Sequence, residues 1–433
     1  MKIKIFLLFT LFSILRLSAV ELSLSQCRQM ALESSELLKI SQNKVVQSDL
    51  DRGIARTAYL PKLSGSAMAM YMTPNSSMGD AMELQLKGVY MAGFNIVQPV
   101  YAGGKIVTAN KLARLGRDVA DLELEATRMD VIADAEKTYW MYVAVLSKID
   151  MLNAYMTQLD SLYDYTKFAY DIGMTTELNL MRVESKKSEL QYRLRQAQSG
   201  CDICRLSLCR IVGLADDESI TPTEKIAERT AVSDAFAGID NRPELGLSKL
   251  GVTAKKHDVS MVRADFLPTL GLQIAWNAFG NMKMKNFITM DDGTVYPFTQ
   301  TIKYNGFSGV LSLSVPIFHW GEGLRKGKKA KIEVENASLQ LEYNTRMMEL
   351  EARQAYNNYM DSFDAIRSAQ KAYNETRRNL DIMNEQYEAG LMTLTDLLDA
   401  QSQWQTAYSN LIEAQTQHLI YRIDYRRSTG TMD

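Results

Sequence analysis

Two spacings of hydrophobic residues alternate along this chain, and the first has a period of two. In residues 270–278 and 307–317, apolar residues occupy nearly every second position, with mostly small or polar residues between them. A noisier version of the pattern covers residues 86–96. Successive side chains of a strand point to opposite faces, so this period predicts strands with one apolar face. We expect one two-stranded hairpin in each half of the chain, with strands of about 10–13 residues, longer than usual.

The second spacing is that of helices. Residues 105–171 and 322–388 contain no proline, and apolar or small residues recur in the first stretch at steps of three and four. This predicts long coiled-coil helices rather than a globular α-helical domain, which would need breaks every ~10–20 residues. Gly173 and Gly390 follow these stretches and are expected to end them in a left-handed conformation. We expect return helices over 175–212 and 392–428, and shorter leading helices over about 36–59 and 244–266, which could stack end to end and match the long ones.

The whole pattern occurs twice. Pro99 and Pro316 are 217 residues apart, as are Gly173 and Gly390. A period this long indicates a duplicated domain rather than a short solenoid repeat. The upstream Leu-Pro pairs at 60–61 and 267–268 are only 207 residues apart, so the second half has ten additional residues between its prolines. We expect them in a strand-connecting loop over 280–303, longer than its counterpart over 73–83, with both loops outside the cell.

These patterns predict the following domain organisation. Residues 1–19 form a signal peptide, 20–213 the first repeat, 214–241 an inter-repeat segment and 242–433 the second repeat. The first repeat contains a β-hairpin at about 61–100 and a helical hairpin at about 105–212; in the second, they lie at about 268–317 and 322–428. The signal peptide is predicted from Lys2 and Lys4 before a short apolar run that ends near the small residues Ser18 and Ala19.

Composition narrows the function classes. The formal net charge of -2 gives no support for nucleic-acid binding. His257, His319 and His418 are scattered, and the chain has no phosphate-binding loop or hydrolase motif, so neither an enzyme nor a cofactor is expected. Two features could bind metal: Cys201 and Cys204 have C-x-x-C spacing, and Met68, Met70 and Met72 alternate on one strand. Thiols on a helix and methionines filling an apolar face are the simpler interpretations.

The strands also imply a membrane and an oligomer. Their length suits a tilted membrane-spanning strand of about 9–11 residues, and their alternation fits apolar residues toward lipid and polar residues toward a lumen. Four strands cannot close a barrel, since the smallest outer-membrane barrels have about 8. Two copies would give a barrel filled by side chains, whereas three would give twelve strands and an open lumen.

These features together resemble the TolC-type outer-membrane factor family over nearly the whole mature chain. The resemblance depends on the motif Gln98-Pro99-Val100-Tyr101-Ala102-Gly103-Gly104-Lys105, on residues 387–401 (YEAGLMTLTDLLDAQ) and on the duplication. It implies a mixed α/β membrane protein: a homotrimer with a 12-strand barrel in outer-membrane lipid and a 12-helix periplasmic tunnel. It also implies that residues 214–241 belong to an equatorial segment around the middle of the tunnel.

The resemblance further implies a function: the passive exit channel of a tripartite efflux pump or type I secretion system. Its partners would be a periplasmic adaptor protein and an inner-membrane transporter, and its location the outer membrane of a Gram-negative cell. The alternative is a secreted periplasmic coiled-coil scaffold or adaptor without a membrane barrel. The alternation in the strands favours the channel.

The family's tip residues can be placed on this sequence. Asp396 and Asp399 match the aspartates of the periplasmic aperture, and their spacing of three puts them on one helix face. The arginine of the family's closed gate is replaced by Met392 and its aspartate by Asn179, so a Tyr387–Asn179 hydrogen bond is the most that remains of it. The segments that match the family's adaptor-docking turns are Ile172-Gly173-Met174 and Ala389-Gly390-Leu391.

Overall fold

The computed structural model describes residues 20–73, 75–77, 82–226, 236–291 and 293–432. The predicted signal peptide lies outside the described residues. In chain order the elements are β1 (Val20–Leu22), α2 (Leu24–Ser34), α3 (Glu36–Thr57), β2 (Lys62–Tyr71), β3 (Ser76–Ser77), β4 (Met82–Gln85), β5 (Lys87–Ala102), α4 (Lys105–Asp171), α5 (Glu177–Val212), β6 (Ile220–Pro222), α6 (Pro243–Ala264), β7 (Thr269–Thr289), β8 (Val295–Ser314), α7 (Glu322–Glu388) and α8 (Leu394–Thr429).

The chain divides into two compact units. Unit 1 comprises residues 1–43, 121–248 and 342–433, and unit 2 comprises 44–120 and 249–341. Each unit therefore contains part of both sequence repeats. The two compact units are therefore not the two duplicated halves, because each half contributes matching segments to both units.

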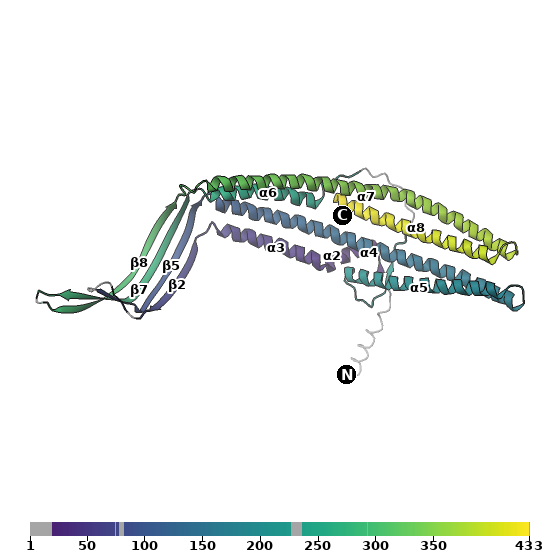
Figure 1. The fold of residues 1–433 in the computed structure, drawn as a ribbon, viewed down its shortest axis with the longest axis horizontal. Coiled ribbons are helices and arrows are strands. Elements are labelled where there is room, and N and C mark those ends of the chain that lie inside the picture. Colours follow the sequence, from purple (N-terminus) through teal and green to yellow (C-terminus); the bar gives the residue numbers. More distant parts are fainter. Residues whose placement is uncertain (1–19, 74, 78–81, 227–235, 292, 433) are drawn as a thin grey trace, which may run out of the picture. The chain divides into compact units, whose positions relative to one another are not determined.

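Unit 2 contains the sheet. The strands β2, β5, β7 and β8 are hydrogen-bonded in that order and are all antiparallel (Figure 1). The short strand β4 pairs with β7 beyond the end of the β5 pairing, and β3 pairs with β4. Among the described residues, β2 pairs only with β5 and β8 only with β7. The sheet therefore has two free edges.

The strands are longer than the sequence predicted, and the predicted long loop is wrong. β5, β7 and β8 have 16, 21 and 20 residues, and only β2, with 10, falls in the expected range. Most of residues 280–303 belongs to β7 and β8, whose pairing reaches Thr289 and Val295. A bulge between Phe279 and Met282, with Asn281 at a φ of 61°, interrupts the alternation but not the strand. The bulge therefore explains why the sequence pattern placed residues 280–303 in a loop.

The two faces of the sheet differ as the alternation predicted. On one face Phe94 and Trp276 stack at 5.7 Å between ring centroids, and Phe307 beside them is 80% exposed. The side chains around an open hollow on this face are all apolar: Leu63, Phe94, Ile96, Ile274, Trp276 and Phe307. The opposite face has mainly serine, asparagine and glutamine over much of its length. An exposed apolar face of this kind is suited to contact with lipid acyl chains.

Both long helices are confirmed. α4 and α7 have 67 residues each and coincide with the proline-free stretches, and α5 and α8 have 36 residues each. Helix α2, which the sequence patterns did not predict, precedes α3 and is capped by Ser23. None of the described helices is apolar enough over a sufficient length to cross a membrane.

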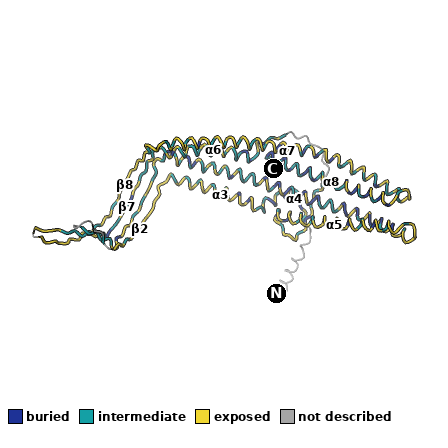
Figure 2. The backbone as a smooth tube through the Cα atoms, in the orientation of Figure 1, coloured by how far each residue is buried: buried dark blue, intermediate teal, exposed yellow. Residues whose placement is uncertain are grey.

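Unit 1 has two hydrophobic clusters, and α4 contributes to both (Figure 2 shows burial along the chain). One cluster joins α4 to α2, α5 and α8 around Tyr139 and Trp140, and the other joins α4 to α5, α7 and α8 around Tyr155 and Leu159. The hydroxyl of Tyr139 donates to the carbonyl of Leu22, and that of Tyr142 to the carbonyl of Ile220. These bonds fasten the parallel pair β1–β6, which includes part of the inter-repeat segment, to α4.

The four cysteines are free thiols in unit 1. Cys201, Cys204 and Cys209 lie on α5, so the C-x-x-C spacing belongs to a helix, as the simpler interpretation had it. Cys27 on α2 is fully buried, and burial raises the pKa of its thiol to about 12. Burial also raises the pKa values of the other three thiols. Thiols held in the protonated form are poor nucleophiles and poor metal ligands.

Candidate functional site

The candidate site lies in unit 1, at the two turns that connect the long helices to the short ones. Gly173 and Gly390 adopt φ values of 76° and 73°, the left-handed conformation that side chains disfavour. The amide of Met174 donates to the carbonyl of Ala169 at 2.7 Å, and that of Leu391 to the carbonyl of Gln386 at 2.9 Å. These are Schellman-type bonds that satisfy the last carbonyls of α4 and α7. The same backbone geometry thus closes both helical hairpins.

The turns expose apolar side chains. Ile172 is 52%, Met174 79% and Leu391 75% exposed, and Ala389 is also exposed. Large apolar side chains usually avoid such exposure unless they meet a partner. The chemistry of both turns is therefore suited to docking another protein.

Thr393 caps the start of α8, and Asp396 completes the capping box. The Thr393 hydroxyl accepts from the amide of Asp396, and the Asp396 carboxylate accepts from the amide and hydroxyl of Thr393, at 3.3 and 2.6 Å. Such reciprocal bonds satisfy amide groups that the first helical turn leaves unpaired. Asp396 therefore has a structural role that the sequence comparison did not indicate.

Asp396 and Asp399 point away from the core of unit 1. Both are exposed, whereas Leu394, Leu397 and Ala400 on the other side of α8 are buried. The Asp399 carboxylate accepts from the Gln403 amide at 2.8 Å. The burial pattern thus presents two carboxylates on one exposed face. Two exposed carboxylates this close in sequence can attract cations.

Tyr387 and Asn179 have other partners in this chain. The Tyr387 ring packs edge-on against the Tyr165 ring, with 6.1 Å between the ring centroids, and burial raises the pKa of Tyr387. The Asn179 side chain donates to the Thr175 hydroxyl at 3.0 Å. The Tyr387–Asn179 hydrogen bond stays a prediction. Tyr387 also lines a cleft of about 300 Å³ where α4, α7 and α8 meet.

One link at the tip was missed by the sequence analysis. Arg182 on α5 donates from Nη1 to the hydroxyl of Thr395 on α8, at 2.7 Å. This bond joins the two helical hairpins one residue before Asp396. An arginine three residues after Asn179 was the available sequence signal, but its partner is 213 residues away and no local pattern identifies it.

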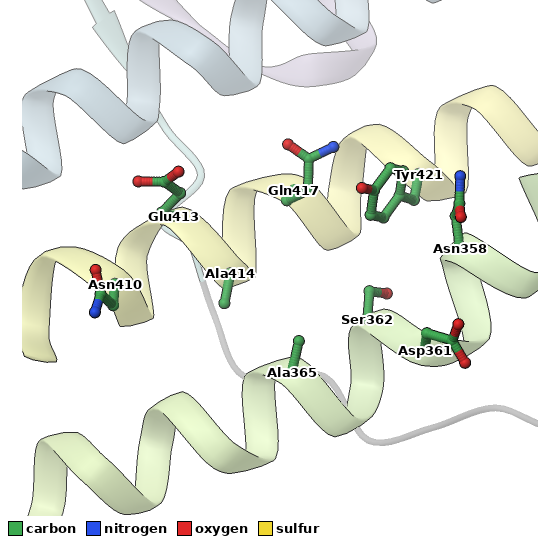
Figure 3. Close-up of a pocket in the computed structure, with 9 residues that line it drawn as sticks. All are labelled: Asn358, Asp361, Ser362, Ala365, Asn410, Glu413, Ala414, Gln417 and Tyr421. Carbon is green, nitrogen blue, oxygen red and sulfur yellow. The ribbon is translucent and has the colours of Figure 1, made fainter.

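A second recess lies between α7 and α8, farther from the turns (Figure 3). Ala365 and Ala414 lie on the facing sides of the two helices, and the recess has a volume of about 460 Å³. Ser362, on its lining, is hydrogen-bonded to Nδ1 of the buried His418 at 2.8 Å. The small side chains of Ala365 and Ala414 leave the space between the two helices unfilled here. In the part of the chain that the structure describes, no three His, Cys, Asp or Glu residues are grouped to hold a metal ion.

The comparisons with known proteins agree with this geometry. The model of the outer membrane efflux protein family matches residues 27–214 and 238–431. The outer membrane protein TolC of Vibrio cholerae is 21% identical over 79% of this chain and 76% of its own length. The alkaline protease secretion protein AprF of Pseudomonas aeruginosa is 22% identical, over 97% and 87%. The fold is similar to the crystal structure of the Campylobacter jejuni CmeC outer membrane channel, with a TM-score of 0.77 and 19% identity over 94% of this chain and 85% of that one.

These matches decide between the two functions that the sequence left open. Channels of the TolC family form trimers and work with efflux-pump partners. The alternative of a periplasmic scaffold without a barrel is not supported, because the family match includes the strand region of both repeats. This chain belongs to the outer membrane efflux protein family: it is a non-enzymatic outer-membrane channel of the efflux and type I secretion class that extends into the periplasm.

Proposed function

We propose that three copies of this chain close a twelve-stranded barrel and continue it as a helical tunnel through the periplasm. The observation that carries the proposal is the pair of free sheet edges, β2 and β8. Unpaired backbone groups cannot remain in the hydrocarbon of a membrane, so each edge needs a partner. Antiparallel pairing of β8 with β2 of the next copy satisfies both edges, and three copies give a lumen wide enough for solutes.

The tips of the tunnel are the proposed meeting point with a periplasmic adaptor protein, which connects the channel to an inner-membrane transporter. The exposed Ile172, Met174 and Leu391 support this role, together with Gly173, Ala389 and Gly390, which shape the turns. The transporter supplies the energy and the channel conducts passively. In the same assembly we place residues 214–241, of which 227–235 lie outside the described residues, in an equatorial segment around the tunnel, and we propose the domain boundaries given above.

The aperture would be lined by Asp396 and Asp399. Three copies bring six carboxylates to one constriction, and rings of acidic side chains favour cations over anions. The gate contact proposed at Tyr387 and Asn179 is uncharged, so it would hold the closed state less firmly than an ion pair. The bond from Arg182 to Thr395 offers a second restraint within each copy. We therefore expect Arg182→Ala to increase the closed-state conductance and Met392→Ala to change it little.

Labelling of intact cells with a membrane-impermeant thiol reagent tests the topology. One cysteine is introduced by Asp291→Cys, in the turn between β7 and β8, and another by Met174→Cys, in the turn after α4. We expect Asp291→Cys to react on intact cells and Met174→Cys to react only after lysis. The native chain, whose thiols are buried or half-buried, is the control. The reverse order, or a monomer in detergent in place of a heat-sensitive trimer, contradicts the proposal.

A further inference from the structure

The polar face of the sheet changes character along its length, and the register of the four strands shows where. Three successive rows across β2, β5, β7 and β8 are mostly polar or small: Lys62–Val97–Gln273–Val310, Ser64–Asn95–Ala275–Ser308 and Ser66–Gly93–Asn277–Gly306. The next row, toward the turn between β7 and β8, is Met68–Met91–Phe279–Tyr304. We call this last row the belt. It is the first row of this face without a charge, an amide or an aliphatic hydroxyl.

The row that follows the belt is also apolar. Met70 pairs with Val89, and beyond the bulge Met282 pairs with Ile302, on the same face. The change is therefore not one isolated substitution. It extends over two consecutive rows and includes four methionines, with Met68 and Met91 directly paired.

The belt side chains are exposed or partly exposed in this chain. Met68, Met91 and Tyr304 are 54%, 41% and 44% exposed. The rings of Phe279 and Tyr304 stack at 5.7 Å with 21° between their planes. A Cβ at Gly306 would come within 2.8 Å of the Tyr304 hydroxyl oxygen, so the phenol lies over the glycine backbone, against the sheet. Phe279 and Tyr304 thus form an aromatic platform beside two flexible thioethers.

In the proposed trimer, only water and passing solutes reach this face. Lipid covers the opposite face, which carries Phe94, Trp276 and Phe307, and neighbouring copies cover the sheet edges. Methionine side chains adapt to ligands of varied shape, and thioethers and aromatic rings attract one another. We propose that the belt binds the apolar, aromatic parts of amphipathic solutes as they pass through the barrel, an inference that rests on the proposed channel function.

Two monovalent cations with different apolar surfaces provide the test. Tetraphenylphosphonium carries four aromatic rings, whereas tetramethylammonium carries the same charge with little apolar surface. We expect tetraphenylphosphonium to block potassium current through wild-type channels in planar bilayers at concentrations at least ~10-fold lower than tetramethylammonium, because only the former can use thioether and ring contacts. An acidic aperture attracts both cations alike, so charge alone gives no such ratio.

Matched variants locate the binding site. In Met68→Ser with Met91→Ser, the half-blocking concentration of tetraphenylphosphonium should rise about fivefold, the size expected for the loss of two thioether–aromatic contacts. The control, Val97→Ser with Val310→Ser, makes the same kind of change on the same face, and these valines are similarly exposed, at 41% and 53%. It should leave the block within about twofold. Met68→Leu with Met91→Leu preserves volume and apolar character and should retain the block.

The outcomes separate this inference from the channel function. If the wild-type protein forms no conducting trimer, the proposed function fails. If it conducts but the two cations block equally, or if the valine control weakens the block as much as the methionine variant, the belt proposal is overturned. Loss of the block in the leucine variant, together with block by silver ions that only the methionines support, would make the belt a soft-metal site instead and would also overturn it.

Discussion

The two helical tips share a backbone but differ in how the returning helix begins. Thr176 and Thr393 occupy equivalent N-cap positions with extended backbones, yet only Thr393 makes side-chain capping bonds. The difference follows from the residue three positions later, which is Asn179 in the first repeat and Asp396 in the second. In the second tip one carboxylate both secures the helix and provides negative charge. In the first tip Glu177 supplies negative charge in the first turn of α5, but no side chain caps the helix. Duplication thus kept the shape of the turn while the repeats diverged in chemistry.

The helices behind the tips diverge in the same way. In α8 sixteen residues are buried, against five in α5, although both have 36 residues. Leu394 and Leu397 anchor the first turn of α8 in the cluster that α4 also enters, whereas Glu177 and Leu180 at the equivalent positions of α5 are exposed or half-buried. The second tip is therefore the more firmly held of the two. The predictions below test this difference.

The largest expected effect is on the packing of α8. Leu397→Ala should lower the free energy of unfolding by about 2–5 kcal/mol, because it removes a fully buried side chain and leaves a cavity. Leu180→Ala, at the equivalent position of α5, should cost clearly less. Denaturant unfolding of the solubilised protein, followed by circular dichroism, measures both. Equal losses would show that the two tips are held equally.

The second effect is on cation binding at the aperture. Asp396→Asn with Asp399→Asn should raise the half-blocking concentration of a trivalent cation roughly tenfold or more, since each carboxylate contributes on the order of 1 kcal/mol even in water. Asparagine at position 396 also weakens the capping box, so Thr393→Ala, which disturbs the cap but keeps both carboxylates, is the matched control. Single-channel recording measures the block. An unchanged block and selectivity would mean that another face of α8 lines the constriction.

A smaller effect should distinguish the two caps. Thr393→Ala removes capping bonds and should cost about 1 kcal/mol of stability, the usual value for an N-cap threonine. Thr176→Ala removes no capping bond and should be nearly neutral. Hydrogen exchange of the first-turn amides of α5 and α8 gives a local readout. Faster exchange in α5 than in α8 of the unmodified protein is also expected; the opposite order would contradict the comparison.

The smallest effect is expected for a substitution that makes the first tip more like the second. Asn179→Asp places a carboxylate at the third position of α5, where it can accept from the amide of Thr176 and interact with the helix dipole. We expect a gain of about 0.3–1 kcal/mol in stability. It should also strengthen cation block if the first tip borders the aperture. Asn179→Ala is the matched control, and equal stability of the two variants would exclude the capping explanation.

Several elements could be read from the sequence because their causes are local. The absence of proline from 105–171 and 322–388 and the glycines after each stretch determine where α4 and α7 end. Alternation along β7 and β8 identified the apolar and polar faces, since the period of a strand does not depend on its partners. The motif 387–401 identified the region of Asp396 and Asp399, although not the bond from Asp396 to Thr393.

The failures have equally specific causes. The sequence pattern placed residues 280–303 in a loop, but pairing on both sides of the bulge, with Tyr304 and Ile302, carries β7 on to Thr289. The Arg182–Thr395 bond joins residues 213 positions apart, and no pattern along one segment encodes it. The belt was visible only as alternating methionines on one strand. The register across four strands was needed to place Phe279 and Tyr304 beside Met68 and Met91.

The sequence by itself thus determined the repeat, the helix ends, the two faces of the strands and the family, because these depend on neighbouring residues and on their period. Only the tertiary structure decided the strand lengths, the partners of Tyr387 and Asn179, the bond that joins the two tips and the composition of each row across the sheet. Those features depend on contacts between segments that the chain brings together from far apart, where burial and hydrogen bonding outweigh local preference.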